Sequence, residues 1–245
     1  MSGAELGLAV SVFLACAVEA VEALTIVMAV GYTRDWPSAL AGACSALVLL
    51  ALVVALAGVA LASLPIDDVR LLVGVVLLVF GWRWLRKAVL RAAGLKALHD
   101  EEEIFAEQEE QARAAAPAGG GGLDGYSFVI SLKGVLLEGL EVVLIVIGFG
   151  AGQHRVGLAA AAAALAVVLV VAAGAAARAP LARVPENTMK FAVGVLLSSF
   201  GIFWIGEGLG TSWPLDDASV LAIIALVWGC SAAAVSLLRQ REPYA

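Results

Sequence analysis

Charged residues are scarce in this chain of 245 residues. They make up 15% of the sequence, whereas 62% of the residues are hydrophobic and the mean hydropathy is +0.98. A soluble domain is about one-quarter charged. The composition therefore excludes an ordinary soluble globular protein and is typical of an integral membrane protein.

Cysteine and histidine are also rare, with three and two residues respectively. Each cysteine stands alone in an apolar stretch, without a CxxC pair or a Cys/His cluster. We interpret all three as packing residues and expect neither a disulfide framework nor a soft-metal site. Neither histidine falls in a segment apolar enough to span a membrane, which argues against a zinc site.

Seven segments are long and apolar enough to cross about 30 Å of hydrocarbon as helices. The first has no basic segment before it and carries Glu19 and Glu22 in its middle. We therefore expect it to remain as a transmembrane helix rather than to be cleaved as a signal peptide. The predicted spans are residues 5–32, 38–64, 69–90, 126–151, 156–178, 188–208 and 217–238.

The distribution of Lys and Arg at the ends of the spans predicts an outer N-terminus and a cytoplasmic C-terminus. In this orientation the outer side receives only two basic residues, Arg70 and Arg155, and most of the others are cytoplasmic. The outer side also receives five acids: Asp67, Asp68, Glu207, Asp216 and Asp217. We expect a multi-pass protein of the cell inner (plasma) membrane.

One long polar stretch, about residues 91–125, is then cytoplasmic. Its acidic run, residues 100–110, is predicted to continue the third span as a helical extension, and Ala114 to Gly122 is predicted to be a flexible linker. Such a run is typical of a solvated helix face. A cytoplasmic metal sensor with His99 as a further ligand is the alternative.

An internal repeat divides the chain. Residues 18–27 match residues 137–146 at an offset of 119, and residues 73–77 match residues 193–197 at an offset of 120. Two matches at nearly one offset indicate a duplication. Because each half has three spans, an odd number, the halves enter the membrane from opposite sides and form inverted repeats.

The predicted fold class is therefore an all-α integral membrane protein, with seven transmembrane helices arranged as two inverted three-helix repeats plus one C-terminal helix. Four parts are expected along the chain. They are the first repeat (1–90), the cytoplasmic acidic helix and Gly-rich linker (91–125), the second repeat (126–208), and a peripheral seventh helix with the tail (209–245).

Two Glu-x-x-Glu pairs stand in corresponding places of the repeat. Glu19 and Glu22 share one helix face because they are three residues apart, and Glu138 and Glu141 do the same in the second half. An ionised carboxylate in mid-membrane costs several kcal/mol, and no Lys or Arg lies at that depth in any predicted span. The compensating charge must come from outside the chain, as a metal ion, protons or both. A protonated Glu that only bonds two helices together is the structural alternative.

Carboxylate oxygens are hard ligands, which suit Mn²⁺, Mg²⁺ and Ca²⁺ and accept Fe²⁺. The predicted metal ligands are Glu19, Glu22, Glu138 and Glu141. Four facing carboxylates cannot all remain ionised when the metal leaves, because like charges repel strongly in a low dielectric. We therefore expect at least one of them to take up a proton, and transport to be coupled to protons.

The run Glu138-Gly139-Leu140-Glu141 resembles the signature of the oxidase-coupled iron permease and iron/lead transporter family, and Glu19-Ala20-Val21-Glu22 is a weaker form of it. The chain also looks related to the broader lysine-exporter superfamily. The resemblance implies seven spans, an outer N-terminus, and metal-ligand roles for the four glutamates. Val18 and Leu137 stand where the iron permeases carry an Arg, so the resemblance does not fix the ion.

We predict a secondary transporter of divalent metal cations, Fe²⁺ or Mn²⁺ foremost, with the metal ion as substrate and no cofactor. An enzyme is not expected, because the spans contain neither a histidine nor an HExxH motif. The lipid bilayer, the metal ion and protons are the expected partners, nucleic acid is not, and a homo-oligomer is left open. The alternatives are an exporter of an organic cation, such as a basic amino acid, and a non-transporting membrane scaffold.

Overall fold

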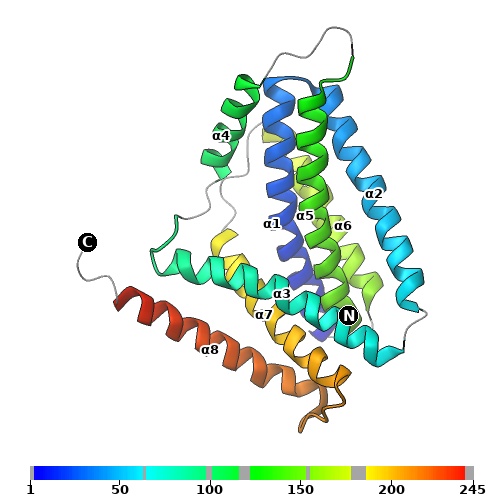
Figure 1. Ribbon diagram of the computed structural model, residues 1–245, viewed down its shortest axis with the longest axis vertical. Helices are drawn as coiled ribbons and strands as arrows, with labels where there is room; N and C mark the ends of the chain where they lie inside the picture. The colour runs from blue at the N-terminus through cyan, green and yellow to red at the C-terminus, as the bar shows by residue number, and fades with distance from the viewer. Residues whose placement is uncertain are drawn as a thin grey trace. The chain divides into compact units, whose positions relative to one another are not determined.

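The computed structural model describes residues 3–62, 65–97, 101–115, 122–152, 155–177 and 186–240. Within these ranges the chain forms eight α-helices and no strand (Figure 1). The all-helical prediction is therefore confirmed. His99, most of the predicted glycine-rich linker and the loop around residues 178–185 lie outside the described residues.

Each of the seven predicted spans is helical along nearly its whole length. Five of these helices (α1, α2, α6, α7 and α8) are long and apolar enough to cross a membrane, which indicates a multi-pass membrane protein. The bounds of the seven helices are Gly3–Thr33 (α1), Trp36–Ala62 (α2), Ile66–Ala92 (α3), Gly125–Gly152 (α5), Val156–Ala177 (α6), Glu186–Gly208 (α7) and Ser219–Gln240 (α8).

The acidic run forms a helix of its own, α4 (Glu101–Ala114), and the prediction that it extends the third span is wrong. Helix α3 ends at Ala92, and Gly94 follows with φ +84°. This left-handed conformation favours glycine and closes a helix C-terminus, here with the Leu95 amide bonded to the Leu90 carbonyl at 2.9 Å.

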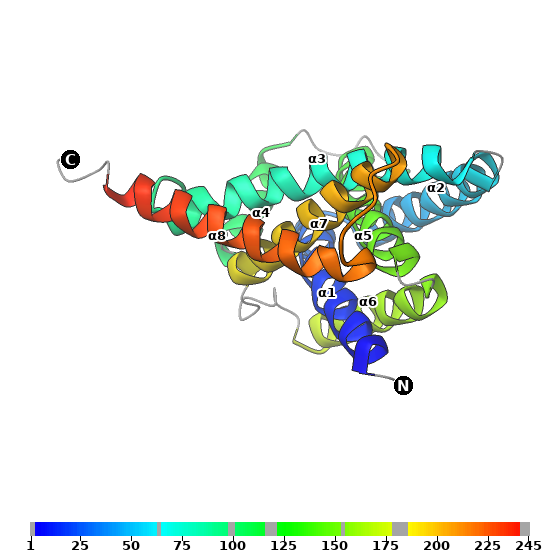
Figure 2. The same ribbon diagram turned by 90° about the horizontal axis from the view of Figure 1, so that it is seen from below.

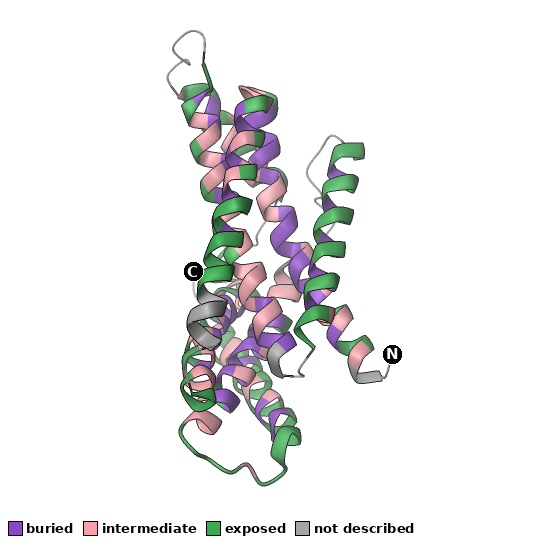
Figure 3. Ribbon diagram, turned by 90° about the vertical axis from the view of Figure 1, so that its right-hand side faces the viewer, coloured by how far each residue is buried: buried purple, intermediate pink, exposed green. Residues whose placement is uncertain are grey.

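The helices α2, α6 and α8 expose many large apolar side chains. On α2 the exposed set includes Leu52 at 54% and Leu56 at 70%, and Figure 3 shows the exposed stretch in green. Water would disfavour contiguous apolar surface of this kind, whereas lipid accommodates it. The exposure pattern thus agrees with helices that face a bilayer.

The chain divides into two compact units, and each combines helices from both predicted repeats. Unit 1 contains α1, α2, α4, α5 and α6, and unit 2 contains α3, α7 and α8 together with the short 3-10 helix Asp216–Ala218. In unit 1, α6 packs against α1 through a cluster of Ala20, Val21 and Val170. A second cluster joins α1, α2 and α4 through Val30, Ala39 and Ala112.

In unit 2, α7 and α8 lie beside α3 (Figures 1 and 2). Glycines set how closely α3 and α7 approach. A Cβ added to Gly81 would lie 2.5 Å from the Ser198 amide nitrogen, and one added to Gly201 would lie 2.6 Å from that of Leu78. Only a residue without a side chain fits such positions, because the opposing atoms are backbone.

The contacts between α3 and α7 repeat at the offset found in the sequence. Adding 120 to Gly81 and Leu78 gives Gly201 and Ser198, so the two close contacts exchange places under the repeat. Gly74 and Gly194 behave in the same way, with added Cβ atoms 3.1 Å from the Gly201 carbonyl oxygen and 3.3 Å from that of Gly81. Residue numbers rise on α3 as they fall on α7, so the helices run antiparallel.

Replacing Gly81 with alanine should destabilise unit 2. The new methyl group would meet the Ser198 backbone, and overpacking of this kind costs about 1–3 kcal/mol. Gly229→Ala on α8 is the matched control, because nothing lies within 4 Å of its added Cβ and alanine favours helix by up to about 1 kcal/mol. Thermal unfolding in detergent should show a lower midpoint for Gly81→Ala only; equal midpoints would contradict the packing.

Candidate metal centre

Helix α1 contributes two carboxylates of the centre. Val12, Cys16 and Glu19 are fully buried at 0% exposure and follow one another at spacings of four and three residues, so they share one helix face. Glu22 lies one turn beyond Glu19 and is half-buried. The apolar spacing that buries this face of α1 therefore also carries a glutamate into the interior of unit 1.

Helix α5 contributes the third carboxylate, from the half-buried Glu138. Two glycines allow α5 to come close to its neighbours. A Cβ added to Gly134 would lie 3.0 Å from Cγ2 of Ile26 on α1, and one added to Gly139 would collide with the Leu50 side chain on α2. The close approach brings Glu138 within reach of α1.

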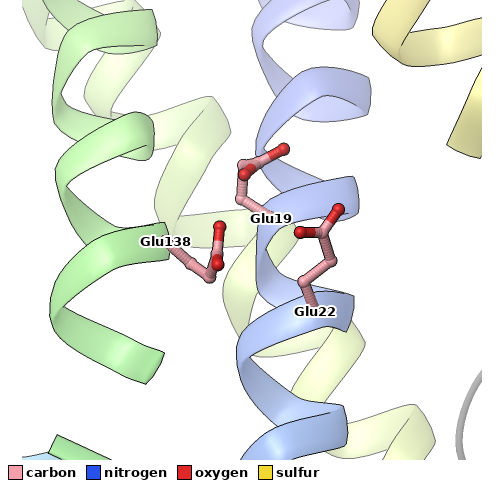
Figure 4. A group of neighbouring side chains, drawn as sticks. All are labelled: Glu19, Glu22 and Glu138. Atoms are coloured by element: carbon pink, nitrogen blue, oxygen red, sulfur yellow. The ribbon is translucent and has the colours of Figure 1, made fainter. Parts of the chain in front are cut away.

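The three carboxylates converge. One oxygen from each of Glu19, Glu22 and Glu138 lies within 4.8 Å of the other two, and Figure 4 shows the side chains from α1 and α5 beside one another. Oxygen ligands lie about 2.0–2.6 Å from Mg²⁺ or Ca²⁺, so oxygens of one coordination shell are separated by at most about 5 Å. The cluster has the ligand type and spacing to bind a metal ion.

Glu141 is the predicted ligand that the structure leaves out of this group. It is half-buried on α5, one turn beyond Glu138. In the repeat it corresponds to Glu22, which is a member of the group. The two halves therefore contribute unequally, with two carboxylates from α1 and one from α5.

A cavity of about 630 Å³ adjoins the carboxylates inside unit 1. Among the described residues that line it, only Glu19 and Glu138 are acidic. The other lining side chains come from α1, α2, α5 and α6 and are almost all apolar. Met28 and Leu50 are typical of this apolar lining. A cation in the cavity would meet its strongest attraction at the two carboxylates.

A network of charged groups fixes α1 to α5 at one end of unit 1. Arg34 donates from Nε to Asp124 at 2.7 Å and from Nη2 to the other oxygen of that carboxylate at 2.9 Å. Both side chains are largely buried, with 11% and 6% exposed. Asp124 also caps α5, because its carboxylate accepts a hydrogen bond from the Ser127 amide at 3.2 Å.

The hydrogen bonds from Arg34 hold the pKa of Asp124 well below its usual range, although burial opposes this shift. The same pairing raises the pKa of Arg34. Both groups are therefore charged at any physiological pH. They lie outside the helices that they join, and they form an ionic link between the end of α1 and the start of α5.

The sequence did not reveal this link. Asp124 and Arg34 are 90 residues apart, and no local sequence pattern connects them. One local pattern was available, since an Asp three residues before Ser127 is typical of a helix N-terminus. The partner of a capping Asp cannot be deduced from that pattern.

No protein-family model matches the chain, and comparison with curated proteins and with solved structures also gave no match. The resemblance to the iron permeases therefore depends on the Glu-x-x-Glu motifs and the pattern of spans alone. The function has to be inferred from the residues of the centre.

Glu138→Gln should weaken metal binding more than Glu141→Gln does. Glu138 belongs to the converging group, so its removal takes away a ligand and should cost at least about ten-fold in affinity. Mn²⁺ binding to purified protein, followed by calorimetry, compares two identical substitutions one helical turn apart. Equal losses of Mn²⁺ affinity in the two variants would show that Glu141 contributes to metal binding as much as Glu138 does.

Asp124→Asn should lower stability by about 1.5–3 kcal/mol at pH 7, because it breaks charge-assisted hydrogen bonds. A carboxylate with a depressed pKa stabilises the fold fully above its unfolded pKa, about 4, and loses this effect as the pH falls below it. The difference in unfolding midpoint from the unaltered protein should be constant from pH 5 to 8 and smaller at pH 3. Asp67→Asn, which breaks an exposed pair with Arg70, is the control and should change little.

Proposed function

We propose that the protein is a secondary transporter that moves divalent metal cations, Fe²⁺ or Mn²⁺ foremost, across the cell membrane. The observation that carries the proposal is the convergence of Glu19, Glu22 and Glu138 inside a bundle of apolar helices. Three acids at this place are costly without a cation, and intramembrane acids are typical of ion pathways. A transport role, and not catalysis, accounts for them.

The position of the carboxylates along their helices supports this function. Glu19 lies near the middle of α1 and Glu138 near the middle of α5. If both helices span the bilayer, the cluster is at mid-depth, where transporters with inverted repeats bind their substrates. Helix α5 then counts as a span despite its charged residues, since two of them belong to the Glu-x-x-Glu motif.

The proposed architecture has seven spans, with two inverted repeats and an outer N-terminus. The antiparallel contact of α3 and α7, which maps onto itself at an offset of 120, supports the inverted relationship. Unit 1 contains a corresponding pair of contacts. Gly139 packs against Leu50, and the residues at the equivalent positions of the repeat, Ala20 and Val170, lie in one cluster. These correspondences also support the proposed distant relationship to transporters of the iron permease type.

Proton coupling follows from the same carboxylates. When a divalent ion leaves, the acids of the cluster repel one another in a low dielectric, and a proton relieves the repulsion. Metal release and proton uptake then belong to one step. Flux that does not change between about pH 5 and 8 would contradict the coupling.

An organic cation is the second candidate substrate, and the cavity favours it. Pockets for organic ligands are about 300–1,000 Å³ and mostly apolar with a few polar groups. The cavity of about 630 Å³ with two lining carboxylates meets that description. A compound with one amine and an apolar body would place its charge at Glu19 and Glu138.

Uptake into proteoliposomes tests the function. Fe²⁺, Mn²⁺, Ca²⁺ and Zn²⁺ compete for flux through the unaltered protein, Glu138→Gln and the control Asp217→Asn, which removes an exposed acid outside the cluster. We expect selective flux that falls at least about ten-fold in Glu138→Gln and is kept in the control. If no metal ion moves at any pH but a basic amino acid does, the substrate is an organic cation and the metal assignment is wrong.

A further inference from the structure

Two ion pairs lie at opposite ends of α1. Beyond its C-terminal end, Arg34 is bound to Asp124, which immediately precedes α5. In its first turn, Glu5 accepts from Arg155, which immediately precedes α6, at 2.9 Å. Each pair therefore ties an end of α1 to a segment from the second half of the chain.

The two pairs correspond to each other in the repeat. Adding 119 to Glu5 gives Asp124, so the two acids occupy equivalent positions at the start of α1 and of α5. Adding 119 to Arg34 gives position 153, two residues before Arg155. The acids of the two pairs are thus equivalent in the repeat, whereas Arg155 stands two residues beyond the position equivalent to Arg34.

The carboxylate cluster lies halfway between the pairs. Glu19 is 14 residues after Glu5 and 15 residues before Arg34. At 1.5 Å per residue this places each pair about 21 Å from Glu19 along the helix. The two pairs therefore stand at opposite ends of the helix that carries Glu19, and none of their four residues lines the cavity.

The pairs differ in strength. Arg34 donates two bonds to Asp124 and one each to the Ala112 and Ala115 carbonyls at 2.8 and 3.1 Å, and it is 11% exposed. Arg155 contacts Glu5 at 2.9 Å and is 60% exposed. Solvent screens an exposed pair, so the Glu5–Arg155 pair is the easier of the two to open.

We infer that the two ion pairs are the gates of the transport pathway, and that each must open for the carboxylate cluster to be reached from its side. The substrate assignment depends on the proposed function, but the gates themselves are defined by the geometry of unit 1. The weaker Glu5–Arg155 gate opens more readily at rest. Opening the Arg34–Asp124 gate also releases the C-terminal end of α4, so the acidic helix moves with that gate.

Labelling of a reporter cysteine tests the gates without any metal. The three native cysteines are replaced by alanine, and Ala23→Cys places a thiol on the cavity wall one turn from Glu19. Vesicles of known protein orientation are treated with a membrane-impermeant methanethiosulfonate from one side at a time. The labelling rate then reports how open the pathway is from each side.

Asp124→Asn should raise labelling from the side of α1's C-terminus by at least about ten-fold and leave the opposite side unchanged. Glu5→Gln should raise labelling from the other side, by about two- to five-fold because this pair is exposed. The exchange Arg34→Asp with Asp124→Arg should restore slow labelling if it restores the pair. Labelling that is unchanged in both neutralised variants, or raised equally from both sides, would overturn the inference.

Arg113→Gln is the matched control, because it breaks an exposed pair with Glu109 that lies within α4 alone. It should not alter labelling from either side. Failure of the gates and failure of the proposed function remain distinguishable, since metal binding to Glu138→Gln is measured separately. Normal metal binding with side-independent labelling would reject the gates alone, and gated labelling without metal binding would reject the metal substrate alone.

Discussion

Repulsion among carboxylates in an apolar interior is the constraint on which the rest of the structure depends. Oxygens of Glu19, Glu22 and Glu138 lie within 4.8 Å of one another. In a medium of low dielectric, like charges at such distances repel by several kcal/mol unless a cation or a proton is present. The helices that carry them must be held together by other contacts, and those contacts lie along α1, α2 and α5. Close packing at Gly134 and Gly139 and the ionic link from Arg34 to Asp124 supply them.

The fold separates these two kinds of contact by depth. Within the spans, glycine and alanine allow close van der Waals packing, which needs no charge and is compatible with lipid. The ion pairs stand at the ends of the helices, away from this packing. The carboxylates near the middle of α1 and α5 are thus left to bind a cation. The same separation explains why α1 can be buried around Glu19 yet carry charged groups at both ends.

Much of this architecture could be predicted because it follows from local sequence patterns. Apolar runs of about 20 residues predicted the helices, and the internal sequence match predicted which of them correspond. Besides the link between Arg34 and Asp124, two features could not be predicted. The turn after Ala92 depends on Gly94 in a left-handed conformation. The acidic residues that follow favour helix, so the sequence alone suggests that α3 continues through this turn. Whether Glu141 faces the cluster depends on the rotation of α5 about its axis. The spacing between Glu138 and Glu141 is the same whether or not Glu141 faces the cluster, so the sequence does not determine it.

The inequality of the two halves has a physical consequence if they are inverted repeats as proposed. Identical halves would give two conformations, open to either side, of equal energy, because exchanging the halves would convert one into the other. The chain departs from that identity at corresponding places. Glu22 joins the cluster whereas its equivalent Glu141 does not, and Arg34 is buried in its pair whereas Arg155 is exposed. On the proposed function, such differences make the two conformations unequal in energy, and the divergence between the halves then decides from which side the empty site is more readily reached.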